Sequence, residues 1–155
     1  MSILNAINKL KQIQQFSVED SIYEIIAENK YFIEFLLRYQ MSQGVDGNNN
    51  PTLAVFGPFY ADRTIFNKEH NGIGLGAETN IVTNYMTGKF YDSIVFQSDS
   101  GSVVFTSDVE YFSKIIERSG IDIMKLNDEN AKILEEEVIN PQLKQKYNDF
   151  VNAIS

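Results

Sequence analysis

The middle of the chain places the strongest constraint on its fold. Residues 44–80 hold six of the nine glycines, two of the three prolines and the run Asn48-Asn49-Asn50, without sustained apolar periodicity. Turn chemistry such as Asp46-Gly47 interrupts any regular element there. We therefore expect an extended loop or arm over 44–80, between a helical segment at 1–43 and a mixed segment at 81–155. A chain of 155 residues fits a single domain.

The first segment has the pattern of two helices. Apolar residues recur at intervals of three and four over residues 3–13, which predicts a short amphipathic helix. Ser17 followed by Asp20 is typical of a helix N-cap with an acidic first turn. The apolar residues beyond it predict one helix of roughly 20–25 residues, ending at Gly44, as the spine of the core. They are Ile22, Ile25, Ile26, Phe32, Ile33, Phe35, Leu36, Leu37 and Tyr39.

A β-hairpin is predicted in the last segment. Residues 93–96 and 103–105 are rich in β-formers, and the polar stretch between them turns near residues 99–101. Just before the hairpin, Thr87 is expected to cap a short helical turn that starts at Gly88. The residues of this turn expected to face the core are Phe90 and Ile94, and those expected to face solvent are Lys89 and Asp92.

Three helices are predicted after the hairpin. The first is capped by Asp108 and ends at Gly120, the second opens at Asn127, and the last has Pro141 at its first position. The fold class is therefore α+β and helix-rich. A long N-terminal helix and C-terminal helices surround a small antiparallel β-hairpin, with a long central loop.

Composition excludes several kinds of chemistry. The chain has no cysteine, so thiolate metal sites, cysteine nucleophiles and redox motifs are excluded, and its single histidine, His70, leaves no imidazole pair for a metal. A formal net charge of −8 disfavours binding to bulk nucleic acid or anionic membranes. No signal-peptide pattern or membrane-spanning apolar run occurs, so we expect the protein to remain in the cytoplasm where it is made.

Four patterns that resemble catalytic or binding motifs have simpler interpretations. The glycines of 72–76 are not followed by Lys-Ser or Lys-Thr, which favours a tight or mobile loop over a phosphate site. His70 beside Glu69 is expected to be solvated. Glu135-Glu136-Glu137 points in three directions around a helix. Residues 46–50 lack the glycine and glutamate positions of a calcium loop. We expect no metal, no cofactor and no catalytic centre.

The aromatic residues of the central segment favour a contact role. A disordered linker seldom contains several aromatic side chains, so we expect this segment to pack on something. The surface could belong to a partner, or the aromatic residues could fold back on the long helix of their own chain. The expected assembly contacts are Phe56, Phe59, Tyr60, Phe66, Ile73 and Leu75.

Short motifs spread over residues 35–155 add a family resemblance. In chain order they are Tyr39-Gln40, Gly44-Val45-Asp46-Gly47-Asn48, Thr87-Gly88-Lys89-Phe90-Tyr91-Asp92-Ser93, Gly120-Ile121, and Leu126 with Asn130. In this order, beside a loop rich in Gly and Asn, they resemble small bacteriophage virion-morphogenesis proteins of the head-tail connection or tail-completion type, from phages of Bacteroidetes hosts. The chain departs from that pattern in Tyr85-Met86, where a charged residue is common, and in its acidic charge.

The resemblance implies a structural subunit of a virion, made in the host bacterial cytoplasm, and not an enzyme. Such a subunit assembles as a homo-oligomeric ring between portal-side and tail-side neighbours, and DNA passes through the ring without specific binding. The motif residues are Thr87, Gly88, Phe90, Tyr91 and Ser93. The alternative is a small acidic regulatory or inhibitor protein that binds one host partner through its helical surface.

Overall fold

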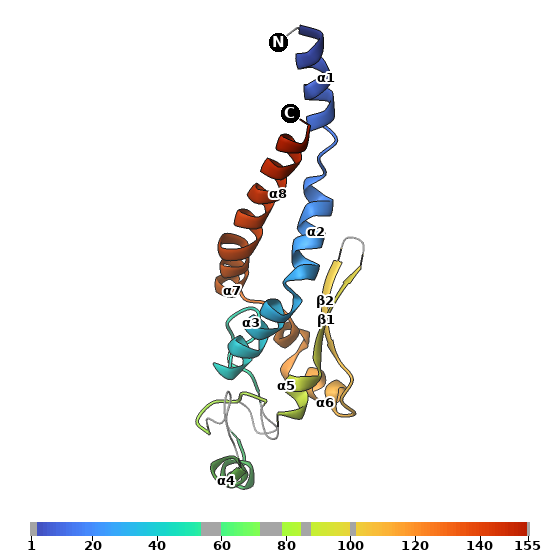
Figure 1. Cartoon of the computed structure of the whole chain (residues 1–155). Helices are drawn as coiled ribbons and strands as arrows, with labels where there is room; N and C mark the ends of the chain where they lie inside the picture. The colour runs from blue at the N-terminus through green and yellow to red at the C-terminus, as the bar shows by residue number, and fades with distance from the viewer. Residues whose placement is uncertain (1–2, 54–59, 72–78, 85–87, 100–101, 155) are drawn as a thin grey trace. The chain divides into compact units, whose positions relative to one another are not determined.

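The protein is helix-rich with a two-stranded antiparallel sheet, which confirms the α+β prediction (Figure 1). The computed structural model describes residues 3–53, 60–71, 79–84, 88–99 and 102–154. The chain divides into two compact units. One unit contains residues 30–132. The other, which we call the arm, is formed by residues 1–29 together with residues 133–155.

The arm is built from helices of both chain ends. Its elements are α1 (Ile3–Ile13), α2 (Val18–Glu28), the π-helical segment η2 (Leu134–Ile139) and α8 (Asn140–Ala153). Ser17 caps α2 as predicted, because its hydroxyl oxygen accepts the Asp20 N–H at 3.1 Å. Helices α2 and α8 run side by side (Figure 1). Between α1 and α2, the Phe16 ring packs on the rings of Tyr147 and Phe150.

The long N-terminal helix expected up to Gly44 is in fact two helices. Helix α2 ends at Glu28, and α3 runs over Lys30–Ser42. At the break, the side-chain amide of Asn29 donates to the Ile25 carbonyl at 2.7 Å, the same oxygen that accepts the Asn29 backbone N–H. An asparagine that bonds to its own backbone competes with continued helix. The prediction of one uninterrupted helix is therefore wrong at Asn29.

At the other end of the chain, two predicted helices are joined. Helix α7 (Asp128–Ile133) continues through η2 into α8. Pro141, in the first turn of α8 as predicted, has no N–H to donate and crowds the carbonyl of Glu137. The helix widens there, so that the Asn140 N–H bonds to the Glu135 carbonyl, five residues back. Glu135, Glu136 and Glu137 are exposed, as expected.

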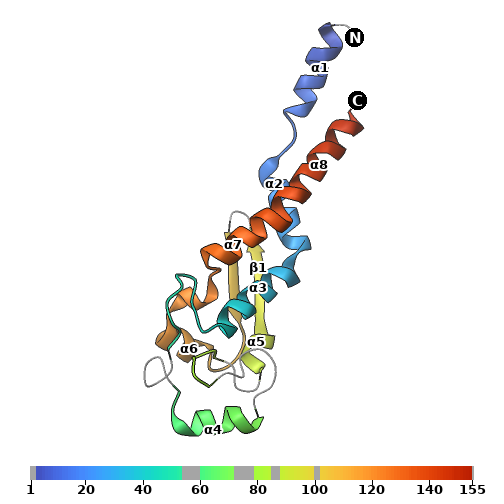
Figure 2. The same ribbon diagram turned by 90° about the vertical axis from the view of Figure 1, so that its left-hand side faces the viewer.

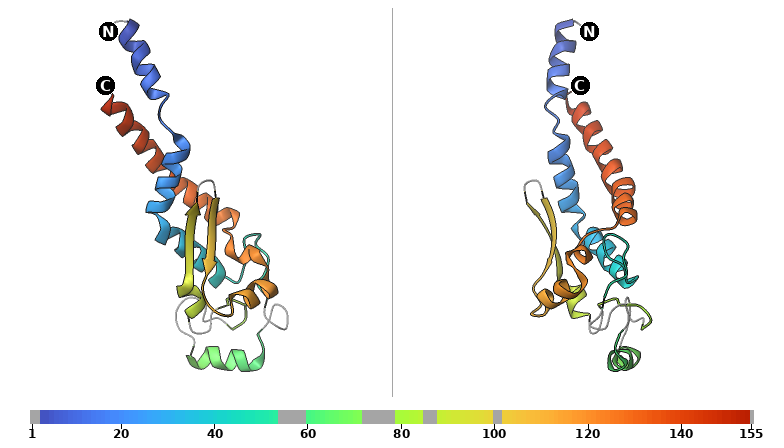
Figure 3. Two further views of the ribbon diagram at one scale, coloured as in Figure 1. Left: turned by 90° about the vertical axis from the view of Figure 1, so that its right-hand side faces the viewer. Right: turned by 180° about the vertical axis from the view of Figure 1, so that it is seen from behind.

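Residues 30–132 hold most of the buried core. Their elements are α3, α4 (Asp62–Asn71), α5 (Lys89–Ser93), β1 (Ile94–Asp99), β2 (Ser102–Ser107), α6 (Phe112–Ser119), the 3₁₀ turn η1 (Ile121–Met124) and the start of α7. Helix α3 packs against β1 (Figure 3). The buried apolar side chains are Ile33, Leu36, Leu37, Met41, Val82, Phe90, Tyr91, Ile94, Phe96, Phe105, Ile115, Ile123 and Met124. Phe90 and Ile94 therefore face the core as predicted.

The predicted hairpin is confirmed. Strands β1 and β2 pair in an antiparallel register that places Phe96 opposite Phe105, with their rings edge to face at 5.5 Å. Residues 100 and 101 of the expected turn lie outside the described residues. On the far side of β1, Glu34 Oε1 accepts the Phe96 N–H at 3.0 Å, and Arg38 donates to the Ile94 carbonyl at 3.1 Å. Side chains of α3 thus satisfy the outer backbone of β1, as a third strand would.

Two helix starts differ from the predictions. Gly88 is the N-cap of α5, with φ +82°, and not its first helical residue, because this left-handed conformation suits glycine. Thr87, the predicted cap, lies outside the described residues. Helix α6 begins at Phe112, after a turn in which the Phe112 N–H bonds to Val109, so Asp108 does not cap it. Gly120 ends α6 as predicted.

The expectation of a continuous loop over 44–80 is wrong for residues 62–71, which form α4. This helix has no apolar periodicity, which is why the apolar pattern did not predict it. Its charges were the available signal: Asp62 lies in the first turn and Lys68 and His70 in the last, an arrangement that favours a helix through its dipole. Earlier in the segment, a bridge between Val45 and Pro51 closes a compact turn.

Candidate protein interface

Helix α3 exposes only aromatic residues. Tyr31, Phe35 and Tyr39 are 82%, 48% and 44% exposed, and every other residue of α3 is buried or half-buried. Their spacing of four places them along one side of the helix. We call these three residues the α3 stripe. The rings of Phe35 and Tyr39 lie 6.2 Å apart and nearly parallel.

The buried part of α3 contains polar side chains among its apolar core residues. Buried Gln40 accepts the Asn127 N–H at 2.7 Å and donates to the Lys125 carbonyl at 2.9 Å. Buried Glu34, besides its bond to β1, pairs with Lys30 at 3.8 Å and Arg38 at 3.6 Å. These polar side chains are buried because each has a partner on a neighbouring element or turn.

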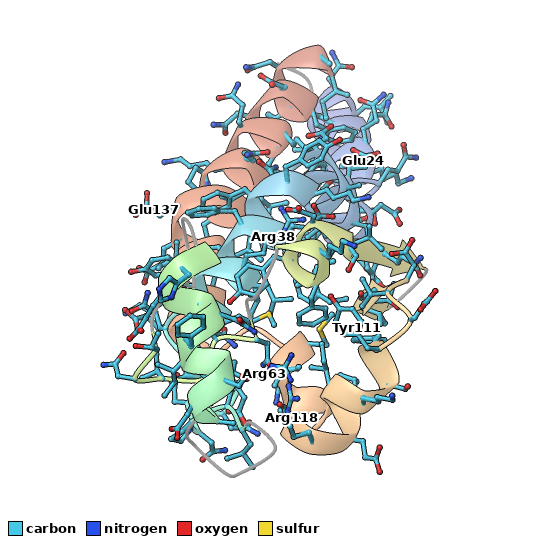
Figure 4. The ribbon with its side chains drawn as sticks, turned by 90° about the horizontal axis from the view of Figure 1, so that it is seen from below. Glu24, Arg38, Arg63, Tyr111, Arg118 and Glu137 are labelled. Carbon is cyan, nitrogen blue, oxygen red and sulfur yellow. The ribbon has the colours of Figure 1, made fainter. Side chains whose placement is uncertain are left out.

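This arrangement corrects the sequence interpretation. Phe35 and Tyr39 were expected in the core, because α3 is apolar on nearly every side and its pattern does not show which side is outward. Glu34 and Gln40 are instead buried among the core residues, and the aromatic residues are exposed. Exposed aromatic rings grouped on one face are typical of protein interfaces, where Tyr and Phe are enriched. Arg38 lies on α3 next to this face and carries positive charge (Figure 4).

The residues predicted as assembly contacts divide into three groups. Phe66 is 58% exposed on α4 and stacks on His70, with ring centroids 4.0 Å apart. Tyr60 is half-buried, and its hydroxyl oxygen accepts the N–H groups of Thr83 and Asn84 at 2.8 and 3.0 Å. The structure therefore does not place Tyr60 and Phe66 on a common exposed face. Phe56, Phe59, Ile73 and Leu75 lie outside the described residues, as does the glycine run of 72–76.

A polar cluster around Tyr60 holds α4 in place. The side chain of Lys68 is 1% exposed, donates to the Thr83 hydroxyl at 2.9 Å and lies 4.6 Å from the centre of the Tyr60 ring. Burying a lysine is favourable only when its ammonium group has such partners. These bonds connect α4 to residues 82–84, so we assign the cluster a structural role.

Arg118 extends this cluster from the last turn of α6 (Figure 4). Its guanidinium donates to the Leu53 carbonyl at 2.7 Å and to the Asn84 side-chain oxygen at 2.5 Å. Partial burial lowers the pKa of Arg118 from its ordinary value. The backbone of Asn84 has a positive φ of 56°, a conformation that asparagine adopts more readily than most residues, and Arg118 binds its side-chain oxygen. Arg118 thus links α6 to the segments that precede and follow α4 in the sequence.

The described motif residues that carried the resemblance make hydrogen bonds that hold the fold together. Tyr91 is buried and donates to the Thr83 carbonyl at 2.6 Å. The Ser93 hydroxyl bonds to the Phe90 carbonyl at 2.7 Å and to the Ser107 hydroxyl at 2.6 Å, which joins α5 to the end of β2. With Gly88 as the N-cap, the described residues of the motif form the compact entry into the hairpin.

The segment 46–50 also has a structural role. The Asp46 carboxylate accepts the backbone N–H groups of Asn48 and Asn50 at 2.8 and 2.9 Å, and Asn49 accepts the side-chain amide of Asn127 at 2.7 Å. Asp46 therefore serves the turn itself. Within the described ranges, we find no group of three or more His, Asp or Glu side chains placed to hold a metal ion.

None of the helices in the described part of the chain is long and apolar enough to cross a membrane. No protein-family model, no curated protein and no solved structure matches the chain.

Proposed function

We propose that this chain is a non-enzymatic structural subunit that acts by protein–protein contact. The observation that carries the proposal is the α3 stripe, in which Tyr31, Phe35 and Tyr39 occupy every exposed position of a helix. Large apolar side chains grouped on a surface are costly in water and become favourable when a partner covers them. Aromatic residues of this kind supply most of the binding free energy in many interfaces.

The place we propose for this subunit is a phage virion, at the head-tail connector, the neck or the tail-completion ring. That assignment depends on the resemblance of the short motifs. The structure is compatible with it, since the Thr83, Tyr91 and Ser93 bonds form a rigid base for the hairpin beside α3. Ordered elements lose little conformational entropy when they bind, which suits a permanent assembly.

The alternative is a small acidic regulatory protein that binds one host enzyme. Such a protein would use the same surface, the α3 stripe, but would bind a host protein there and not a virion protein. Capture from lysates of infected and uninfected host cells separates the two. A virion subunit retains portal or tail proteins from infected cells only, whereas an inhibitor retains a host protein from both lysates.

Replacing Phe35 by Asp is expected to weaken binding to the captured virion protein by at least about thirtyfold, because an aromatic residue central to an interface contributes roughly 2 kcal/mol or more. Phe35 is 48% exposed, so the fold should tolerate the change. The affinity is measured with purified proteins by calorimetry, and circular dichroism checks the fold.

The matched control is Tyr111→Asp. Tyr111 is also an exposed aromatic residue of the same unit, at 41%, but it lies at the start of α6 (Figure 4). Its variant should bind like the wild type. Equal loss of affinity in both variants, or none in Phe35→Asp, would contradict the assignment of the α3 stripe.

A further inference from the structure

The arm has almost no core of its own. Among its described residues only Ile25 and Val138 are buried apolar side chains, and α8 has no buried residue. Ordering a residue costs about 1–2 kcal/mol of backbone entropy, and two buried apolar side chains with the half-buried rings of Phe16 and Phe150 offset only part of that cost for two chain segments of this length. The arm therefore needs apolar contacts beyond those it makes within itself.

Helix α1 shows where such contacts are missing. Leu4, Ile7 and Leu10 are 67%, 43% and 61% exposed, and they lie along one side of the helix. The helix extends past the C-terminal end of α8 (Figures 2 and 3). A helix of 11 residues is marginal in water unless its apolar side packs on something. That side of α1 needs a surface that its own arm does not provide.

Helix α2 carries charge of the opposite sign to that of α1. Helix α1 contains Lys9 and Lys11 and no acidic residue, whereas the four charged residues of α2 are all acidic. The acidic residues are Glu19, Asp20, Glu24 and Glu28. Both helices have 11 residues, so they match in length at about 16 Å. On α2, Ile22 and Ile26 are only partly buried and continue an apolar strip beside the charges.

The arm already contains one contact of this kind. Lys146 of α8 bonds to Glu24 of α2 at 3.0 Å and lies 3.6 Å from Glu28. The hydrogen bond to Glu24 raises the pKa of Lys146. The C-terminal half of α2 is thus matched within the arm, while Glu19 and Asp20 at its start are exposed.

We propose that the arm binds the arm of a second copy of this chain, as an antiparallel pair in which α1 of each copy lies along α2 of the other. The two-fold axis passes near residues 14–17, and the interface is self-complementary. The apolar side of α1 covers Ile22 and Ile26, while Lys11, which lies on that side of α1, faces Glu19, which lies beside the two isoleucines of α2. This inference rests on the proposed function, which requires copies of the chain to meet, and it names the element that joins them.

The first test is sedimentation velocity of the full chain across the micromolar range. The wild type should form dimers or dimer-based oligomers, and the variant Leu4→Glu with Leu10→Glu should dissociate with a Kd raised about a hundredfold or more. The control, Asn8→Glu with Gln12→Glu, adds the same charge to exposed polar positions of α1 and should associate like the wild type. A wild type that stays monomeric, or an apolar-face variant that still associates, would overturn the proposal.

A charge exchange tests the pairing of α1 with α2 directly. Lys11→Glu should weaken association, and so should Glu19→Lys. The chain carrying both substitutions should regain association, because the opposite charges again face each other between copies. Failure of the double variant to recover, in a protein whose circular dichroism is unchanged, would overturn the arrangement.

Two further measurements distinguish self-association of the arm from membrane binding and from virion contact. A basic amphipathic helix can also lie on a membrane, so vesicles of phosphatidylserine and phosphatidylcholine are sedimented with the chain. Binding to vesicles without self-association would overturn the proposal. The virion-capture assay is repeated with the Leu4→Glu, Leu10→Glu variant. If the Leu4→Glu, Leu10→Glu variant still captures virion proteins but no longer self-associates, the arm is supported as the element that joins the copies. If Phe35→Asp loses capture, this inference stands only if that variant still forms dimers.

Discussion

Replacing Gln40 by alanine is expected to lower the free energy of unfolding by about 3–5 kcal/mol. Gln40 is 1% exposed, and its amide bonds to the Lys125 carbonyl at 2.9 Å and to the Asn127 N–H at 2.7 Å. The substitution leaves both backbone groups buried without these partners and opens a cavity. Because Asn127 also caps α7, bonding to the Asn130 N–H at 2.9 Å, the start of that helix should loosen as well.

Urea denaturation followed by far-UV circular dichroism measures this loss. Gln40→Met keeps most of the side-chain volume but has no hydrogen-bonding amide, so it should recover only the cavity part of the loss. Gln43→Ala, one turn later and exposed, is the control and should change stability by less than about 0.5 kcal/mol. If Gln40→Met were as stable as the wild type, the buried amide bonds would not stabilise the fold.

Local capping signals were the part of the fold that the sequence predicted well. Ser17 and Asn127 each bond to the N–H three residues later, an interaction that depends on neighbouring residues alone. Gly120 ends α6 with φ +80°, where a glycine is favoured. The hairpin likewise follows from alternating β-formers around a polar turn. Such features need no knowledge of distant parts of the chain.

Features that depend on distant partners were missed. Nothing near Gln40 and Glu34 in the sequence shows that a loop carbonyl and a strand N–H will satisfy them, so the sequence could not show that these two polar side chains lie on the buried part of α3. The α3 stripe was missed for the same reason, because Phe35 was assigned to the core. Helix α4 was missed for a related reason, because it is fastened by buried Lys68 and not by an apolar side.

The two units differ in how much of their apolar surface they bury. Residues 30–132 bury their core and expose aromatic residues on α3, which a partner can cover without refolding. The arm leaves most of its apolar side chains partly exposed, so its own stability depends on association. Thermal unfolding of the arm should therefore shift with protein concentration, while that of residues 30–132 should not. The α3 surface and the arm are thus separable by mutation.

Replacing Gly47 by alanine is expected to destabilise residues 30–132 by about 2–4 kcal/mol. A Cβ at this position would lie 2.7 Å from the Lys125 carbonyl oxygen and 2.9 Å from that of Asp122. The Gly47 N–H donates to the same Asp122 oxygen at 2.8 Å, so the turn cannot retreat without breaking that bond. Both obstacles are backbone, which cannot rotate away as a side chain does.

The measurement is urea denaturation of the full chain, with Asn48→Ala as the neighbouring control. Asn48 is exposed and contributes its backbone N–H to Asp46, which alanine preserves, so its variant should remain within about 0.5 kcal/mol of the wild type. Hydrogen exchange should locate the Gly47→Ala effect in η1 and the start of α7, because Lys125 lies between them and also accepts the bond from Gln40. Loss of stability without faster exchange at these residues would show that the close approach at Gly47 is not its cause.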